Sequence, residues 1–266
     1  MSMFKKIAVA TMAFGLMGSS LLSVTSVSAA SYQSELKTKG TLTVGLEGTY
    51  SPFSYVGKDG KLTGYDVEVA TNVAKKMGLK VKFVETKFDS LPAGLDANKF
   101  DVIYNDMGVN AERQKSYTFA SQYLYTKGVM IVKKNASLKD PKKVKGQKMA
   151  QSTSSDYGEV AKQLGADIIA SPGFTESLDL VESGKAVATF NSADSWGVYK
   201  KANPKTDLKA IDASSVLPKS GAAPMLSKKD QKLAKAITKA QASLKKDGTL
   251  KKLSVKYFGS DLSVDK

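Results

Sequence analysis

The chain of 266 residues contains neither cysteine nor histidine. The missing histidine excludes Ser-His-Asp and Cys-His nucleophilic sites, and the two absences together exclude zinc sites built from His or Cys. Without cysteine no disulfide forms, so the core alone must hold the fold together, and a lipid anchor on a cysteine behind an export signal is excluded. Walker A and G-x-G-x-x-G sequences are also missing, so nothing indicates nucleotide binding. We therefore expect no metal and no cofactor.

Long apolar runs are scarce as well. Residues 7–18 form an apolar run near the start that is too short to span a bilayer. Lys5 and Lys6 precede this run, and small residues around Ala29 and Ala30 follow it. This order is typical of a secretory signal peptide, which we place at residues 1–30. We expect a secreted, extracellular protein, because no later run is long enough for a transmembrane helix.

Acidic residues are few beside the basic ones, with 25 Asp and Glu against 40 Lys and Arg and a formal net charge of +15. Without Lys5 and Lys6 the charge falls by two, to +13. Most of the excess comes from lysines scattered singly and in pairs. One interpretation is a solvated surface; the other is electrostatic retention at the cell surface on an anionic cell-wall polymer. Nucleic acid is not an expected partner, because the chain carries an export signal and lacks nucleic-acid-binding motifs.

Nothing in the sequence makes a convincing catalytic site. Ser34–Lys37 and Ser243–Lys246 match Ser-x-x-Lys, and Lys219-Ser220-Gly221 matches a K-[ST]-G element, but the S-D-N element of penicillin-recognising enzymes is missing. Serine and lysine are abundant, so such matches arise by chance. Asp and Glu are plentiful, yet no pair stands out for glycoside hydrolysis. We expect that the protein is not an enzyme.

Segments with strand and helix periodicity alternate along the chain, which predicts an α/β protein with parallel sheets. Predicted strands are residues 41–46, 79–85, 101–104, 129–133, 147–150, 167–170, 186–190 and 208–211. Predicted helices are 66–77, 90–98, 111–115, 155–164, 175–183, 192–201, 228–246 and a shorter one ending near Phe258. Parallel sheets place ligand sites at the carboxyl ends of their strands.

Three stretches at predicted strand ends could bind a ligand. Residues 45–55 (GLEGTYSPFSY) place Glu47 and aromatic rings in a Gly- and Pro-containing loop, where the rings serve either a ligand or the core. Residues 101–113 (DVIYNDMGVNAER) end on Arg113, whose planar guanidinium suits a carboxylate; a surface salt bridge with Glu112 or another acid is the alternative. Residues 151–155 (QSTSS) lie at a helix start, which binds anions or is simply capped.

Together these stretches resemble the polar amino-acid-binding proteins of ABC importers, solute-binding protein family 3. The likeness runs from GTLTVGLEGTYSPFSY through DGKLTGYDVEVATNVAKKMGLKVKFVE, FDSLPAGLDANKFDVI and NAERQKSYTFASQYLY to KKDGTLKKLSVKYFG. It implies a two-lobed periplasmic-binding-protein-like fold (type II), with two parallel-sheet domains joined by a two-strand hinge. Lobe 1 would comprise residues 31–125 plus 218–266 and lobe 2 residues 126–217, with crossings near Tyr125–Lys127 and Ala213–Gly221.

The resemblance also implies site residues. Tyr50 and Phe88 match an aromatic sandwich, and Glu47 matches a position that faces the ligand side chain. The remaining matches are Asn105, Asp106 and Gly108 in the loop that meets the α-amino and carboxylate groups, Arg113 as the carboxylate clamp, and Thr153 and Ser154 at a helix start. One position departs from the pattern, because Ser192 stands where many members hold the ammonium with an aspartate. Asp106, Asp194 and Glu47 are the candidates to supply that charge.

GLEGTYSPFSY and the asparagine of IYND resemble the cystine-binding branch most. We therefore expect a monomeric solute-binding protein that captures an amino acid, L-cystine first, and delivers it to an ABC transporter permease. The alternative is a basic cell-surface adhesin on the same fold, with a cell-wall polymer or a host matrix protein such as collagen as its partner.

Overall fold

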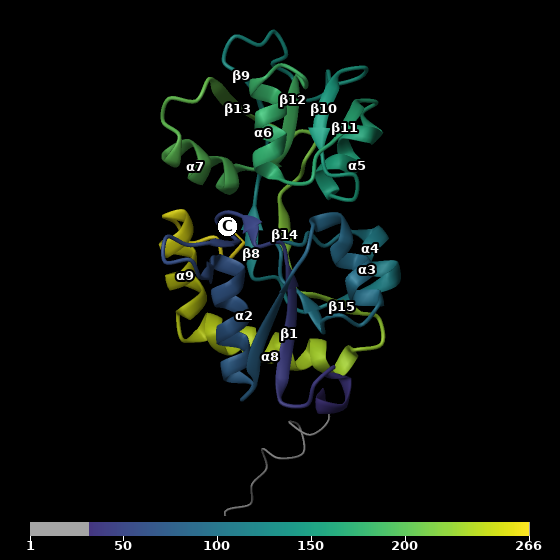
Figure 1. Cartoon of the computed structure of the whole chain (residues 1–266), viewed down its shortest axis with the longest axis vertical. Helices are drawn as coiled ribbons and strands as arrows, with labels where there is room; N and C mark the ends of the chain where they lie inside the picture. Colours follow the sequence, from purple (N-terminus) through teal and green to yellow (C-terminus); the bar gives the residue numbers. More distant parts are fainter. Residues whose placement is uncertain (1–31, 266) are drawn as a thin grey trace, which may run out of the picture.

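The computed structural model describes residues 32–265, so the predicted signal peptide at 1–30 lies outside the described residues. Two α/β lobes lie one above the other (Figure 1). Each contains a five-stranded sheet covered by helices on both faces. Of the described residues, no helix is long and apolar enough to cross a membrane.

The lower lobe is built on the sheet β5-β1-β6-β15-β7. Its strands are β1 (Thr41–Leu46), β5 (Lys80–Glu85), β6 (Val102–Ile103), β7 (Tyr117–Phe119) and β15 (Met225–Ser227). β1 pairs in parallel with β5 and β6, whereas β15 runs antiparallel to both of its neighbours, β6 and β7. The expected parallel sheet is therefore mixed, because a strand from near the C-terminus inserts in the opposite direction.

Helices cover both faces of this sheet. They are α2 (Tyr65–Lys76), α3 (Leu91–Asp96), α4 (Ala111–Ser116), α8 (Gln231–Lys246) and α9 (Thr249–Phe258), with short 3-10 turns η1 (Gln33–Glu35) and η2 (Phe88–Ser90). α2 carries acids in its first turn and lysines in its last, which suits the helix dipole. Its apolar stripe packs beside α8 and α9 in one core, so the C-terminal segment completes the N-terminal lobe.

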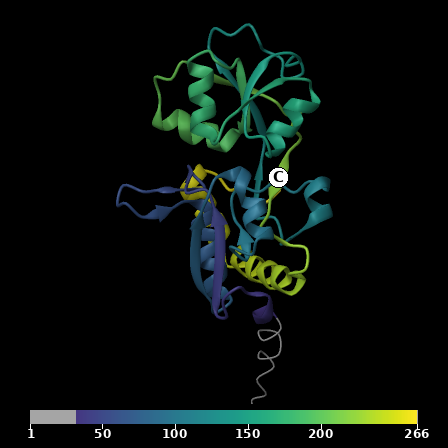
Figure 2. The same cartoon turned by 45° about the vertical axis from the view of Figure 1, so that its right-hand side comes forward.

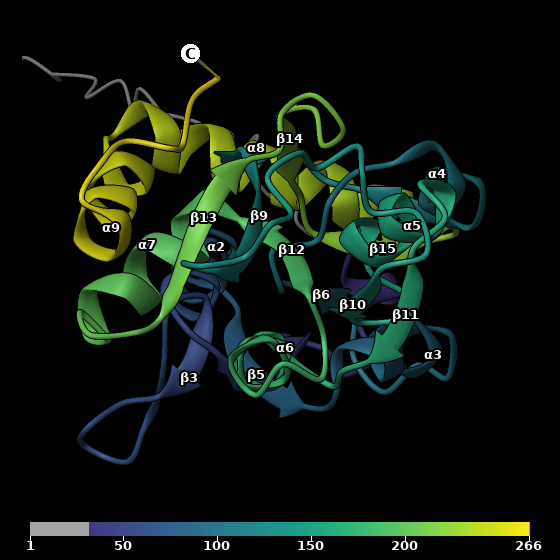
Figure 3. The same ribbon diagram turned by 90° about the horizontal axis from the view of Figure 1, so that it is seen from above.

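The upper lobe is built on the sheet β11-β10-β12-β9-β13, seen from above in Figure 3. Its strands are β9 (Gly128–Lys133), β10 (Lys148–Gln151), β11 (Asp167–Ala170), β12 (Ala188–Ser192) and β13 (Leu208–Asp212). Side chains of β9 alternate between two cores, with Met130 and Val132 in one and Val129 and Ile131 in the other. This sheet is mixed too, because β9 is antiparallel to β12 and β13.

Three helices cover the upper sheet, α5 (Asp156–Gln163), α6 (Phe174–Glu182) and α7 (Ala193–Ala202). Between the lobes run two antiparallel strands, β8 (Leu124–Thr126) and β14 (Ser220–Ala222). Figure 2 shows this pair as the link between the two bodies. A small sheet of β2 (Thr49–Tyr50), β3 (Ser54–Val56) and β4 (Leu62–Thr63) folds the 45–55 stretch as a hairpin at the lobe interface.

Candidate functional site

A cavity opens where the two lobes face each other. It holds about 770 Å³ of empty space, part of it open to solvent. Seven of the ten residues predicted from the sequence line it: Glu47, Tyr50, Phe88, Asn105, Asp106, Gly108 and Arg113. Thr153, Ser154 and Ser192 do not line it. The upper lobe contributes other residues, among them Gln151, Ser155, Asp156, Tyr157, Phe174 and Asn191.

Glu47 and Asn105 form a reciprocal pair where β1 and β6 end. The Asn105 side chain donates from Nδ2 to Glu47 Oε2 at 2.7 Å and accepts the Glu47 backbone N–H at 2.8 Å through Oδ1. Glu47 is 8% exposed. Burial raises the pKa of Glu47 to about 7, against the opposing effect of the Asn105 hydrogen bond and with a further increase from Glu176. This carboxyl therefore titrates near neutral pH when the cavity is empty.

Asp106 follows Asn105 and has a left-handed backbone, with φ of 47°, which is uncommon for a residue other than glycine. Its N–H donates to Asp66 Oδ2 at 2.7 Å, and Tyr123 donates to Asp66 Oδ1 at 2.7 Å. The buried Asp66 at the start of α2 thus fixes this turn. Burial, together with the carboxylates of Asp66 and Asp194, raises the pKa of Asp106 well above its usual range.

Tyr50 joins the two lobes across the cavity. Its hydroxyl donates to Asn191 Oδ1 at 3.0 Å and lies 3.0 Å from Ser195 Oγ, both on the upper lobe. Its ring packs on Phe53 with 4.8 Å between centroids and meets the edge of Phe174 at 6.3 Å. The ring of Tyr50 therefore forms an aromatic wall of the cavity, and its hydroxyl is held by the upper lobe.

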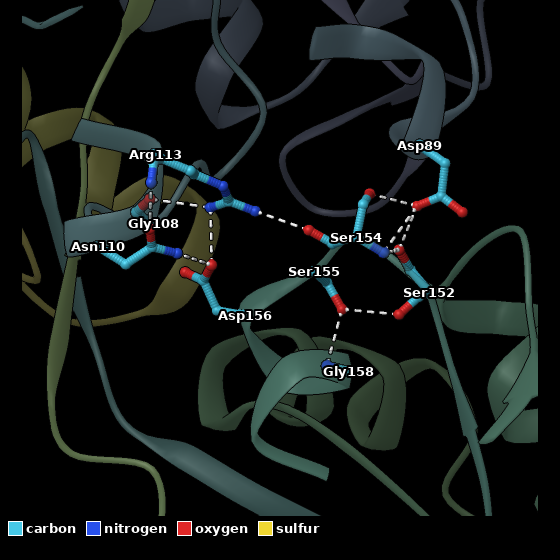
Figure 4. A network of polar contacts seen from close by, with 9 residues as sticks. All are labelled: Asp89, Gly108, Asn110, Arg113, Ser152, Ser154, Ser155, Asp156 and Gly158. Atoms are coloured by element: carbon cyan, nitrogen blue, oxygen red, sulfur yellow. Dashed lines mark hydrogen bonds and ion pairs between the residues drawn. The ribbon is translucent and has the colours of Figure 1, made fainter. Parts of the chain in front are cut away.

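Arg113 projects from α4 into the space between the lobes (Figure 4). Asn110 caps the helix by accepting the Arg113 backbone N–H at 2.7 Å. The guanidinium donates to Gly108 O at 2.9 Å and to Ser154 O at 3.1 Å, and forms an ion pair with Asp156 at 2.9 Å. Burial lowers the pKa of Arg113, and the charge of Asp156 opposes that shift. The arginine is thus held by a carboxylate of the other lobe.

Ser154 lies in a second contact between the lobes, centred on Asp89 of η2 (Figure 4). Thr153 takes part in the same contact. Asp89 accepts hydrogen bonds from Ser152 Oγ at 2.6 Å and from Thr153 Oγ1 at 2.9 Å. Although partial burial acts in the opposite direction, these hydrogen bonds leave the pKa of Asp89 below its usual value. The α5 cap is Ser155, which accepts the Gly158 N–H at 3.0 Å.

Ser192 is fully buried and caps α7 by accepting the Ser195 N–H at 3.1 Å. It therefore presents no group to the cavity, whereas its neighbour Asn191 does. The position that the sequence marked as a departure carries neither the charge nor the exposure needed to hold a ligand ammonium.

Sequence reasoning did not identify several residues of the upper lobe that line the cavity. Phe174 starts α6 behind Pro172 and Gly173, a strand-end loop of the same kind as 45–55, and that position was an available signal. Asp156 is the first residue of α5, and its role depends on an arginine 43 positions earlier in the chain. No local pattern indicates such a pairing.

A second cavity adjoins the first, and Glu47 lines both. Its other lining residues are Thr49, Glu85, Thr86, Lys87, Pro172 and Glu176. Glu47 thus stands between a chamber with one guanidinium and an outer chamber with two more glutamates and a lysine. Within residues 32–265, no group of three or more acids is arranged to hold a metal ion.

The sequence model of the bacterial extracellular solute-binding proteins, family 3, matches residues 42–260. A probable amino-acid ABC transporter-binding protein of Haemophilus influenzae is 43% identical over 229 residues, covering 85% of this chain and 88% of the relative. The L-cystine-binding protein TcyA of Bacillus subtilis is 40% identical over 230 residues, covering 86% and 85%.

Among solved structures, the unliganded, open L-cystine solute receptor of Neisseria gonorrhoeae is 42% identical, with a TM-score of 0.59 over 88% of this chain and 100% of that one. Its fold and the family match agree with the two lobes described above. The chain belongs to the bacterial extracellular solute-binding proteins of family 3.

Proposed function

We propose that this protein captures L-cystine outside the cell and delivers it to an ABC importer. The observation that carries the proposal is a cavity between two lobes whose walls carry one guanidinium, that of Arg113, and three carboxylates, those of Glu47, Asp106 and Asp156. Cystine carries one ammonium and one carboxylate group at each end, and an apolar disulfide joins the two halves. Two of the relatives described above are named for the same ligand.

Each lining residue has a task in this proposal. Arg113 exchanges Asp156 for a ligand carboxylate, since a guanidinium binds carboxylates through parallel hydrogen bonds. Tyr50 and Phe88 enclose the apolar middle of the ligand. Glu47 faces the distal ammonium, in the direction of the outer chamber. Asn105 holds Glu47, and Gly108 leaves room for the Asp156 carboxylate beside Arg113, because a Cβ there would lie 2.1 Å from Asp156 Oδ2.

The other predicted site residues act on closure and local structure. We assign Thr153 and Ser154 to the contact with Asp89 and Ser192 to the cap of α7. The lobes, residues 31–125 plus 218–266 and residues 126–217, close about β8 and β14. A ligand that contacts both lobes favours the closed form.

The protein binds its ligand without converting it. Of the described residues that line the main cavity, the hydroxyl side chains are Tyr50, Thr126, Ser152, Ser155, Tyr157, Ser177 and Ser220. None has a histidine to take its proton, because the chain contains no histidine.

Retention near the cell is electrostatic in this proposal. The excess of lysines gives the exported chain a charge of +13, which attracts anionic polymers of a cell wall. None of the relatives described above is named for adhesion, and an import role accounts for the cavity. The protein is monomeric.

A thermal-shift screen against the amino acids, L-cystine included, tests the function. At about 1,000 times its dissociation constant, a bound ligand stabilises the fold by roughly 4 kcal/mol, so the melting temperature should rise by several degrees. L-cystine should give the largest shift. A flat response to every amino acid would refute capture, and a larger shift with another amino acid would refute the choice of cystine.

A further inference from the structure

An amino acid that leaves water must have its ammonium matched by a negative group, since an unpaired buried charge is costly. Ser192, where the resemblance to the family implies an aspartate for this role, is uncharged, fully buried and engaged in capping α7. Four acids lie in or near the cavity: Glu47, Asp106, Asp156 and Asp194. Asp156 is paired with Arg113 at 2.9 Å and accepts a hydrogen bond from Asn110 at 2.6 Å, which leaves Glu47, Asp194 and Asp106 as candidates for the role. The following inference rests on the proposed function and names the group that fills this role.

Asp194 is already engaged. Its Oδ2 accepts a hydrogen bond from Thr126 Oγ1, and it is not among the residues that line the cavity. Glu47 does line the cavity, but it is paired with Asn105 and lies between the two chambers. Glu47 is therefore placed for the far end of a long ligand rather than for the α-carbon beside Arg113.

Asp106 lines the cavity with almost no partner of its own. Its carboxylate has one described hydrogen bond, from the Tyr50 hydroxyl at 3.5 Å, the outer limit for such a contact. A phenol has a single proton, and Asn191 Oδ1 is closer to that hydroxyl at 3.0 Å. The carboxylate of Asp106 is thus left largely unmatched.

The surroundings of Asp106 are negative as well. The three charged groups that act on it most strongly are Asp66, Asp194 and Asp156, all carboxylates. Burial and these neighbours raise its pKa well above the usual range, as expected where no cation offsets the charge. The left-handed turn held by Asp66 keeps the carboxylate in this position, and such strained conformations concentrate at functional sites.

We infer that Asp106 is the counter-ion of the ligand's α-ammonium, in place of the aspartate that Ser192 replaces. The segment that follows β6 then binds both charged groups at the α-carbon of the ligand, because Asp106 pairs with the ammonium and Arg113 with the carboxylate. Glu47 remains for a second cationic group. The site therefore takes an amino acid with a further ammonium at its far end, and Asn191 of the upper lobe offers a neutral group opposite Tyr50.

Calorimetric titration of Asp106→Asn with two ligands tests the inference. The ligands are L-cystine and 3,3′-dithiodipropionic acid, which keeps the disulfide and both carboxylates but lacks both ammonium groups. Asparagine has the same shape and tolerates a positive φ. Asp106→Gly, which also suits that backbone, is the second variant if the first fails to fold. Asp194→Asn is the control, because it removes a nearby charge outside the cavity lining.

Asp106→Asn should bind L-cystine roughly 30-fold or more weakly than the wild type does. For the diacid the two proteins should agree within about threefold, because no ammonium is present to be lost. Equal affinity for L-cystine in Asp106→Asn, or equal losses with both ligands, would overturn the inference while leaving the capture of cystine intact. A wild type that binds no amino acid would overturn the proposed function and this inference with it.

Discussion

Replacing Arg113 removes the group that we propose for the ligand carboxylate. Its side chain is 12% exposed and donates to the carbonyls of Gly108 and Ser154, while Asp156 lies 2.9 Å from the guanidinium. Arg113→Ala deletes the charge and both donors. Arg113→Lys keeps the charge but cannot present two parallel N–H groups to one carboxylate.

The size of the loss follows from an exchange of partners. Truncating one member of a buried, hydrogen-bonded charge pair costs on the order of 2–5 kcal/mol, or roughly 30- to several-thousand-fold in affinity. In the unliganded protein Asp156 already holds the guanidinium, and Asn110 keeps a 2.6 Å hydrogen bond to Asp156 when the arginine is lost. Binding gains only the difference in free energy between the pairing of Arg113 with the ligand carboxylate and its pairing with Asp156. We therefore expect losses of affinity in the lower part of the range, roughly 30- to 300-fold for Arg113→Ala, and about tenfold for Arg113→Lys.

Calorimetric titration with L-cystine decides the matter, and Lys115→Ala is the matched control. Lys115 lies two residues further along α4 and pairs with Glu112 on an exposed surface, so its loss should leave the affinity unchanged. The melting temperature of unliganded Arg113→Ala should remain close to that of the wild type, because opening of the lobes returns Asp156 to water. Near-native affinity in Arg113→Ala would show that this arginine serves the contact between the lobes alone and that the carboxylate binds elsewhere.

Three further predictions concern stability, closure and retention. Burial raises the pKa of Glu47 from 4.5 to about 7, so the empty fold favours the protonated form of this carboxyl. The free energy of unfolding should therefore fall by up to about 3 kcal/mol as the pH rises from 4.5 to about 7. Urea unfolding at several pH values should show a weaker dependence of this free energy on pH in Glu47→Gln than in the wild type, and equal pH dependence would contradict the assignment. Asp89→Ala removes the hydrogen bonds from Ser152, Thr153 and Ser154, so small-angle scattering of the unliganded variant should give a larger radius of gyration than that of the wild type. An unchanged radius would show that this contact does not hold the lobes together. Washing intact cells with about 1 M salt, where the screening length is about 3 Å, should release the protein; release by detergent alone would contradict electrostatic retention.

Most elements could be predicted from local pattern. Alternation over residues 41–46 and an apolar stripe over 66–77 correspond to β1 and α2 within a residue or so. The helix predicted over 228–246 begins at Gln231 instead. The short strands β7 and β15 were not predicted, because three-residue strands show too few alternations and β15 pairs with segments more than 100 positions earlier. That long-range insertion is also why the lower sheet is mixed rather than parallel, whereas the upper sheet is mixed because β9 is antiparallel to β12 and β13.

The lower-lobe half of the site was predictable for a topological reason. Residues that follow β1 and β6 gather at one edge of the sheet, so Glu47, Asn105 and Asp106 could be placed together from strand ends alone. Contacts across the cleft could not be placed in this way. The pairings of Arg113 with Asp156 and of Asp89 with Thr153 depend on how two separately folded lobes meet, and neither partner carries a local pattern that indicates the other.

Equilibrium dialysis of the wild-type protein against isotopically labelled L-cystine, with mass spectrometry of the released ligand, tests the central claim most directly. The account predicts one L-cystine bound per chain, displaced by unlabelled L-cystine and recovered chemically unchanged. Absence of bound label at saturating concentration, or recovery of a reduced or cleaved product, would contradict capture for import by the cavity between the lobes.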